Sequence, residues 1–125
     1  MTLQSYRVLI VDDNIIFANT LSALVRVTLG NRLSAITLAI NGEDAVEKAL
    51  NDNNYDVIFM DVNMPKMDGV TAAQIINRRL YRQTRIVAIS FLKDMNTVTR
   101  MIEAGAEIFL YKDNLTVESI EEIFN

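Results

Sequence analysis

The chain has 125 residues, of which 50% are hydrophobic, and a formal net charge of −4. It contains no Cys and no His, which excludes disulfides, thiol nucleophiles, imidazole metal ligands and any mechanism that needs a histidine base of its own. The mild acidity and the lack of a Lys/Arg cluster argue against a nucleic-acid surface. Because no signal peptide or membrane-length hydrophobic run is present, we expect one soluble cytoplasmic domain over residues 1–125, with no membrane partner.

Short hydrophobic runs and segments with helical spacing alternate five times along the chain. The former predict strands and the latter helices. In chain order, the expected elements are a strand at 7–11, a helix at 14–29, a strand at 34–40, a turn at 41–42 whose Asn41 caps a helix that reaches Leu50, a polar loop at 51–54, a strand at 57–60, a helix at 70–80, a strand at 85–89, a helix from 94 or 96 to 104, a strand at 107–111 and a helix at 117–124. This alternation predicts an α/β fold with helices on both faces of a parallel sheet. The strand at 34–40 is less purely hydrophobic than the others and is expected at the periphery of the sheet. At helical spacing, Phe17 falls on the packing face of the first helix, Ile102 on that of the fourth and Val117 on that of the last.

The run at 57–60, Val-Ile-Phe-Met, is typical of a strand that is buried on both faces, because its hydrophobic residues do not alternate with polar ones. It is followed directly by Asp61, and the hydrophobic run at 8–11 is followed by Asp12 and Asp13. Ligands of open α/β sheets bind beyond the carboxyl ends of the strands. If these two strands are neighbours, three carboxylates meet at that edge, where their repulsion favours the uptake of a cation or a proton.

The same edge should also receive Ser90 and Lys112, which follow two further strands. Carboxylates without His or Cys suit a hard cation such as Mg²⁺. A carboxylate can also act as a nucleophile and form an aspartyl phosphate. Phosphoryl transfer mainly requires charge neutralisation, which a metal, Lys112 and the Ser90 hydroxyl could supply. The predicted constellation is therefore able to accept a phosphoryl group without a histidine.

The sequence resembles the receiver domain of two-component response regulators, and in build it is similar to the stand-alone chemotaxis type. The resemblance covers essentially the whole chain and rests on four motifs, which are Val11-Asp12-Asp13-Asn14, Met60-Asp61-Val62-Asn63-Met64-Pro65-Lys66-Met67-Asp68-Gly69, Ile89-Ser90 and Phe109-Leu110-Tyr111-Lys112. It implies a flavodoxin-like (βα)5 three-layer sandwich. The implied order of the five parallel strands is 2-1-3-4-5, for which chemotaxis receivers are a standard example.

The resemblance also implies roles for the residues at the sheet edge. Asp61 would be the phosphoacceptor, and Mg²⁺ would be bound by Asp12, Asp13, Asp61 and the backbone carbonyl of Asn63. Lys112 would pair with the phosphoryl oxygens. The implied cofactor is Mg²⁺ alone, and the implied reaction is the domain's own phosphorylation and dephosphorylation rather than enzymatic turnover.

A second set of implied roles concerns the switch and its partners. Ser90 would hydrogen-bond the phosphoryl group, and the aromatic Phe109 would move inward when Ser90 shifts. A histidine kinase or histidine phosphotransfer protein would supply the phosphoryl group. A downstream effector would bind the face formed by the fourth helix, the fifth strand and the fifth helix, at about 94–124. The domain would be a monomer or a weak dimer and would not bind nucleic acid by itself.

Three features depart from the family pattern. Asp113 follows Lys112 where many members have a Pro with a cis bond, so a trans bond is expected here. Phe91 follows Ser90 where a small residue is usual, and its ring is expected to narrow access to Asp61 or to alter the switch. The chain also ends early in the fifth helix.

Four other functions compete with this hypothesis to different degrees. A receiver-like protein-binding module that works without phosphorylation stays open, as does a receiver fragment of a longer DNA-binding regulator, which the absent Pro suggests. A phosphatase of the haloacid-dehalogenase type is disfavoured because Asn63 stands where such enzymes usually carry a second Asp. A nucleotide-binding flavodoxin-like protein is disfavoured because no glycine-rich loop follows the first strand.

Overall fold

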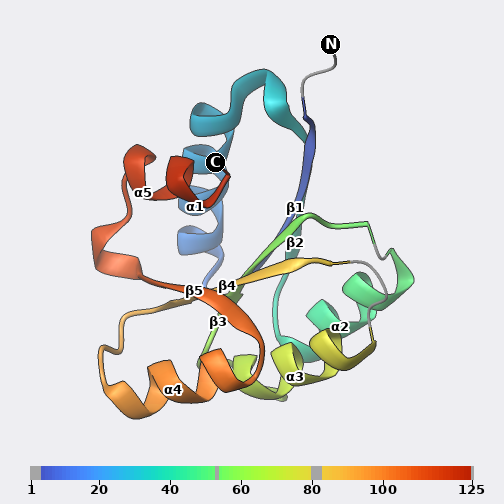
Figure 1. Ribbon diagram of the computed structural model, residues 1–125, viewed down its shortest axis with the longest axis vertical. Helices are drawn as coiled ribbons and strands as arrows, with labels where there is room; N and C mark the ends of the chain where they lie inside the picture. Colours follow the sequence, from blue (N-terminus) through green and yellow to red (C-terminus); the bar gives the residue numbers. More distant parts are fainter. Residues whose placement is uncertain (1–3, 53, 80–82, 125) are drawn as a thin grey trace.

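The computed structural model describes residues 4–52, 54–79 and 83–124, and these residues contain one parallel sheet of five strands. The strand order is β2-β1-β3-β4-β5, as predicted (Figure 1). The strands are β1 (Tyr6–Val11), β2 (Leu33–Ala39), β3 (Val57–Asp61), β4 (Arg85–Ser90) and β5 (Ala106–Tyr111). The less hydrophobic second strand was expected at the periphery, and β2 is indeed an edge strand.

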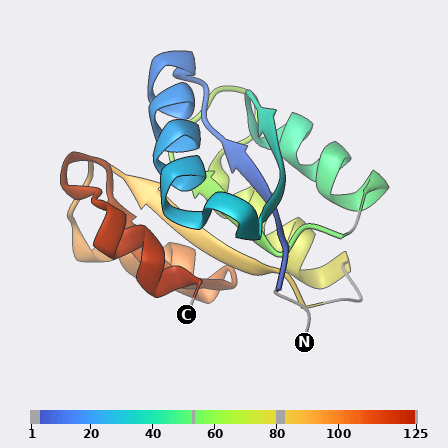
Figure 2. The same cartoon turned by 90° about the horizontal axis from the view of Figure 1, so that it is seen from above.

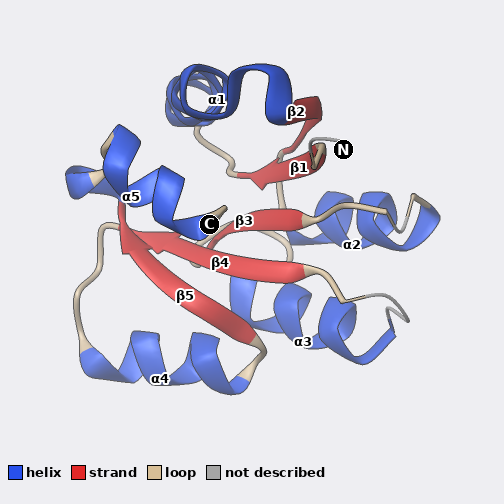
Figure 3. Cartoon of the chain, turned by 45° about the horizontal axis from the view of Figure 1, so that its top comes forward, coloured by secondary structure: helices blue, strands red, loops and turns tan. Residues whose placement is uncertain are grey.

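Helices cover both faces of the sheet, which confirms the three-layer, flavodoxin-like α/β prediction (Figure 3). One face carries α1 (Ile15–Leu29) and α5 (Val117–Ile123), which lie side by side (Figure 2). The other face carries α2 (Gly42–Asn51), α3 (Gly69–Arg79) and α4 (Met95–Glu103). Two short 3-10 helices, η1 (Gly30–Arg32) and η2 (Lys112–Asn114), follow α1 and β5.

The central strand β3 is buried along its whole length, as its sequence predicts. Ile58 and Met60 belong to the core between the sheet and α2, α3 and α4, whereas Val57 and Phe59 belong to the core beneath α1 and α5. The alternation arises because successive side chains of a strand point to opposite faces. A strand packed on both faces has little freedom to move, so the position of Asp61 at its end is well defined.

Some local expectations were wrong. Ile102 and Val117 were expected on the packed faces of their helices, but both side chains are exposed. In α4 the packed residues are Thr97 and Met101, and in α5 they are Ile120 and Ile123. Ile102 directly follows the fully buried Met101, and one residue turns an α-helix by about 100°, so the two side chains point in different directions. Val117 is the first residue of α5, one turn before Ile120.

Element boundaries agree with the sequence analysis to within one or two residues. Asn51 was expected in a polar loop but ends α2. Asn53 of that loop, and Leu80 of the predicted third helix, lie outside the described residues. None of the helices in the described part of the chain combines the length and hydrophobicity that a membrane span needs.

Candidate functional site

Asp61 ends β3, where it lies opposite Ile89 of β4, and only 5% of its surface is exposed. The backbone behind it is packed tightly against α3. A Cβ atom at Gly69 would lie 2.1 Å from the carbonyl oxygen of Asp61, and the Gly69 N–H donates a hydrogen bond to the Val62 carbonyl at 2.8 Å. A side chain at position 69 would therefore displace the end of β3. Nothing in the spacing of the motif indicates this packing role of Gly69.

Two further carboxylates reach the same edge from the end of β1. β1 pairs directly with β3, which confirms that these strands are neighbours. Asp12 is buried, its N–H donates to the Ala39 carbonyl at 3.0 Å, and its Oδ1 accepts from the Asn14 N–H at 2.9 Å. Asp13 is exposed. One oxygen from each of Asp12, Asp13 and Asp61 lies within 4.8 Å of the other two, so the predicted acidic cluster is present.

The ammonium group of Lys112 reaches this cluster from the end of β5. Its Nζ lies 2.6 Å from Asp12 Oδ2 and 3.3 Å from Asp61 Oδ1, and 6% of the lysine side chain is exposed. The Asp12 contact is an ion pair without hydrogen-bond geometry, since Asp12 Oδ2 is a buried oxygen without a hydrogen-bond partner in the described residues. One ammonium group therefore faces three carboxylates.

Burial and this imbalance of charge both act on the Asp61 carboxyl. Burial raises the pKa of the Asp61 carboxyl to about 7, repulsion by Asp12 and Asp13 adds to the rise, and Lys112 opposes it. The ionised form of Asp61 is thus disfavoured until further positive charge arrives. An oxygen-only set of ligands with excess negative charge fits a hard divalent cation such as Mg²⁺.

Ser90 ends β4 and is buried beside these groups, with its Oγ accepting a hydrogen bond from the Leu92 N–H at 2.9 Å. A pocket of about 380 Å³ is lined by Asp12, Asp13, Asn14, Asp61, Asn63, Ser90, Phe91, Leu92 and Lys112. Of the predicted site residues, only Phe109 does not line it. Phe109 is half-buried against the core on the α2–α4 side, and its ring centroid is 5.4 Å from that of Tyr111.

Two phenyl rings complete the surroundings of Lys112. Its Nζ lies 4.5 Å from the ring centroid of Phe17 and 5.5 Å from that of Phe91. Phe91 stands out in the sequence as a departure from the family pattern, whereas Phe17 was expected only to pack in the first helix. The signal for Phe17 was its position in the first turn of a helix that starts at this edge. The described peptide bonds include no cis bond, so Lys112–Asp113 is trans as expected.

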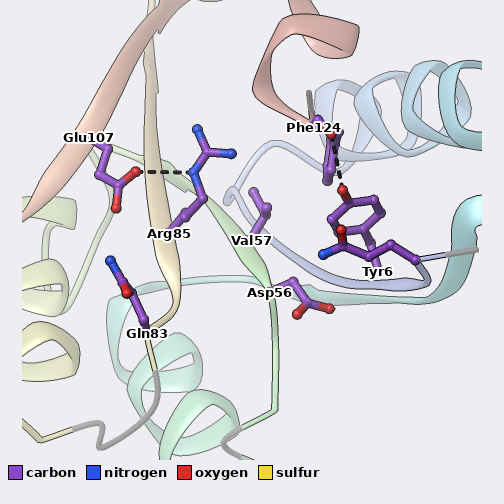
Figure 4. Close-up of a pocket in the computed structure, with 8 residues that line it drawn as sticks. Tyr6, Asp56, Val57, Gln83, Arg85, Glu107 and Phe124 are labelled. Atoms are coloured by element: carbon purple, nitrogen blue, oxygen red, sulfur yellow. Dashed lines mark hydrogen bonds and ion pairs between the residues drawn. The ribbon is translucent and has the colours of Figure 1, made fainter.

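A second pocket lies at the opposite, amino end of the strands (Figure 4). Two contacts join groups that line it: Arg85 Nε lies 3.0 Å from Glu107 Oε2, and the Tyr6 hydroxyl donates to the Phe124 carbonyl at 3.0 Å. Ligands of parallel α/β sheets bind at the carboxyl ends of the strands instead. The acidic pocket is therefore the candidate functional site.

Comparison with known proteins identifies the family. The model of the response regulator receiver domain matches residues 8–124. The chain is 32% identical to the chemotaxis protein CheY of Bacillus subtilis over 125 residues, which cover 97% of this chain and 99% of CheY. It is 41% identical over 120 residues to protein-glutamate methylesterase/protein-glutamine glutaminase 2 of Carboxydothermus hydrogenoformans, covering 94% of this chain. It spans only 32% of the length of that relative.

Solved structures show the same similarity. The receiver domain of NarL from Mycobacterium tuberculosis superimposes with a TM-score of 0.83 at 27% identity, covering 97% of this chain and 94% of that one. The receiver domain of the histidine kinase CKI1 from Arabidopsis thaliana, in a structure complexed with Mg²⁺, gives a TM-score of 0.81 at 25% identity, covering 98% and 94%. The chain therefore belongs to the response regulator receiver domain family of two-component signalling.

Proposed function

We propose that this chain is a phosphorylation-controlled switch in which Asp61 accepts a phosphoryl group from a histidine kinase or a histidine phosphotransfer protein. One observation carries the proposal: a buried carboxylate at the end of β3 is flanked by Asp12 and Asp13 and lies 3.3 Å from the Lys112 ammonium. The chain has no His, so a phosphohistidine donor must come from a partner.

The proposed step joins one Asp61 carboxylate oxygen to phosphorus as the phosphorus–nitrogen bond of the donor breaks, and the imidazole of the partner is released. The product is an aspartyl phosphate, an acyl phosphate. Lys112 lies where it can neutralise charge on the phosphoryl oxygens, and the Ser90 hydroxyl can donate a hydrogen bond to one of them. Positioning and charge neutralisation account for most of the acceleration of phosphoryl transfer.

The residues at the site also support the binding of Mg²⁺. Asp12, Asp13 and Asp61, together with the backbone carbonyl of Asn63, would hold the ion. Bound Mg²⁺ would neutralise the carboxylates and the incoming phosphoryl oxygens. The donor set supports this assignment because it is made only of oxygen, carries excess negative charge, and includes the buried Asp12 Oδ2 that no hydrogen bond satisfies.

Phosphorylation would be transmitted through Ser90 and Phe109 to the face formed by α4, β5 and α5, where a downstream effector would bind. In the sheet, Ser90 pairs with Tyr111, and the nearby Ala88 pairs with Phe109. A shift of Ser90 toward the phosphoryl group would therefore act directly on β5. Residues 1–125 would form one cytoplasmic receiver domain, monomeric or weakly dimeric, that signals through proteins rather than nucleic acid.

A small phosphorus–nitrogen donor tests the proposal without knowledge of the partner kinase. The protein is incubated with phosphoramidate and Mg²⁺, and its intact mass is measured. We expect one phosphoryl adduct, which is absent with chelator and in Asp61→Asn but present in Asp113→Asn. Asp113 is a matched control because it is exposed, follows Lys112 directly and does not line the pocket. An equal adduct in Asp61→Asn would contradict the assignment.

A further inference from the structure

The ammonium group of Lys112 is held by more than its two ion pairs. It lies 4.5 Å from the Phe17 ring centroid and 5.5 Å from the Phe91 ring centroid. The two rings contact each other edge to face, with centroids 6.3 Å apart and an interplanar angle of 65°. Three separate elements meet here: the first turn of α1, the segment after β4 and the segment after β5.

The local structure fixes the position of Phe17. Asn14 caps α1, and its Oδ1 accepts from the N–H groups of Ile16 and Phe17, each at 3.1 Å. The first turn of the helix is therefore tied to the loop that carries Asp12 and Asp13. Phe91, in contrast, is 60% exposed, and Phe17 is its ring partner in the described residues. A large exposed ring next to a charged pocket calls for an explanation other than burial.

The attraction of Lys112 to the ring faces does not depend on the charge of the carboxylates, whereas its ion pairs do. Both interactions hold Lys112 while the carboxylates carry free negative charge. When a divalent cation or a proton takes up that charge, the ion pairs weaken, and a bound cation also repels the ammonium group. The contribution of the rings does not depend on the carboxylates and persists.

We propose that Phe17 and Phe91 are positioning residues whose ring faces hold the Lys112 ammonium beside Asp61. The inference rests on the proposed function only where it concerns phosphorylation; the position of Lys112 is a property of the protein alone. The competing explanation is that the rings merely fill space around the lysine side chain. Leucine fills space but has no ring face, and tyrosine keeps the ring face, so the phosphorylation rates of these variants separate the two explanations, while NMR tests whether the rings lie against Lys112.

The first experiment observes Lys112 by NMR in metal-free protein with ¹³C-labelled lysine. The chain has four lysines, and the Lys112 signal is assigned by its loss in Lys112→Arg. We expect the Lys112 ε-CH₂ protons to be shifted upfield by the ring currents. The upfield shift should shrink in Phe17→Leu and in Phe91→Leu, and it should remain in Phe91→Tyr. Ile16→Ala, which alters an exposed neighbour of Phe17, serves as the control and should leave it unchanged.

The second experiment measures the rate at which acetyl phosphate and Mg²⁺ produce the adduct. Phe17→Leu and Phe91→Leu should each lower the rate roughly threefold, as expected for the loss of one cation–π contact. Phe91→Tyr and Ile16→Ala should each keep the wild-type rate. Because Phe91 is largely exposed, Phe91→Leu is expected to remain folded, which circular dichroism will verify.

Different results of the two experiments would contradict the inference about Lys112 and the proposed function. A Lys112 signal without an upfield shift in the wild type, or one that Phe17→Leu and Phe91→Leu both leave unchanged, overturns the inference about position. Wild-type rates in both Leu variants overturn it as well, while leaving the proposed function intact. If the wild type forms no adduct at all, the proposed function fails, and the NMR result alone decides whether the rings hold Lys112.

Discussion

Gly69 and Asp61 meet through their backbones: a Cβ atom at position 69 would lie 2.1 Å from the Asp61 carbonyl oxygen. The start of α3 is thereby pressed against the end of β3, just behind the proposed phosphoacceptor. The contact explains why a glycine is required at the end of the longest motif, although its backbone conformation does not demand one.

Gly69→Ala should therefore disturb the site as well as the fold. The added methyl group must push β3 or α3 aside, and we expect the free energy of unfolding to fall by about 1–3 kcal/mol, as for other overpacked positions. Adduct formation with phosphoramidate should also slow. Thr71→Ala is the control, because Thr71 is exposed in the same turn of α3. Denaturant unfolding measures the first effect, and a wild-type value for Gly69→Ala would disprove the packing argument.

The raised pKa of Asp61 predicts a dependence of stability on pH. The folded protein keeps a proton on Asp61 up to about pH 7, whereas the unfolded chain releases it near the ordinary value of 3.8. The folded state thus binds more protons between these values, so the contribution of Asp61 to stability decreases as pH rises through this window.

Asp61→Asn removes this titration. In chelator at pH 8, we expect the variant to be more stable than the wild type by about 2–4 kcal/mol, and the difference should shrink toward zero near pH 4. Denaturant unfolding across this pH range gives the difference directly. A constant difference between the two proteins at all pH values would mean that the pKa of Asp61 is not raised in the folded state.

Lys112 is the ammonium group that opposes the acidic cluster. Lys112→Met should raise the pKa of Asp61 further, because the opposing positive charge is gone. At pH 8 without metal, the variant should lose about 3 kcal/mol of stability, since buried carboxylates are left without their partner. Carboxyl ¹³C titration by NMR measures the pKa. Lys93→Met, at an exposed ion pair with Asp113, should leave it unchanged.

Asp13 offers a way to test metal binding with little effect on the fold. Its side chain is exposed, so Asp13→Ala should change the metal-free stability by no more than about 0.5 kcal/mol. A ligand that binds only the folded state stabilises it, by about 2.7 kcal/mol at a concentration 100 times its dissociation constant. We expect Mg²⁺ to raise the melting temperature of the wild type and of Asp113→Asn. It should raise the melting temperature of Asp13→Ala much less.

Those parts of the structure that depend on local sequence could be predicted. The five strands follow from hydrophobic runs, and the acidic cluster follows because the carboxyl ends of parallel strands share one edge. The cap of α1 by Asn14 was equally predictable, because the polar side chain directly precedes the helical pattern.

Features that depend on contacts between distant elements could not be predicted. The Phe17 ring reaches Lys112 only because α1 and η2 start at the same edge of the sheet, and spacing along the chain does not show this. The contact of Gly69 with Asp61 requires the exact approach of α3 to β3. For the same reason, hydrophobicity alone placed Ile102 in the core, whereas Met101 occupies the position that faces the sheet.

The most direct test of the central claim identifies the residue that receives the phosphoryl group. The protein is phosphorylated with phosphoramidate and Mg²⁺ and then treated with borohydride, which reduces an aspartyl phosphate to homoserine. The modified residue is located by peptide mass spectrometry. We predict homoserine at position 61 alone, dependent on Mg²⁺. Homoserine at position 12 or 13, or a phosphorylated protein without any homoserine, would contradict the account.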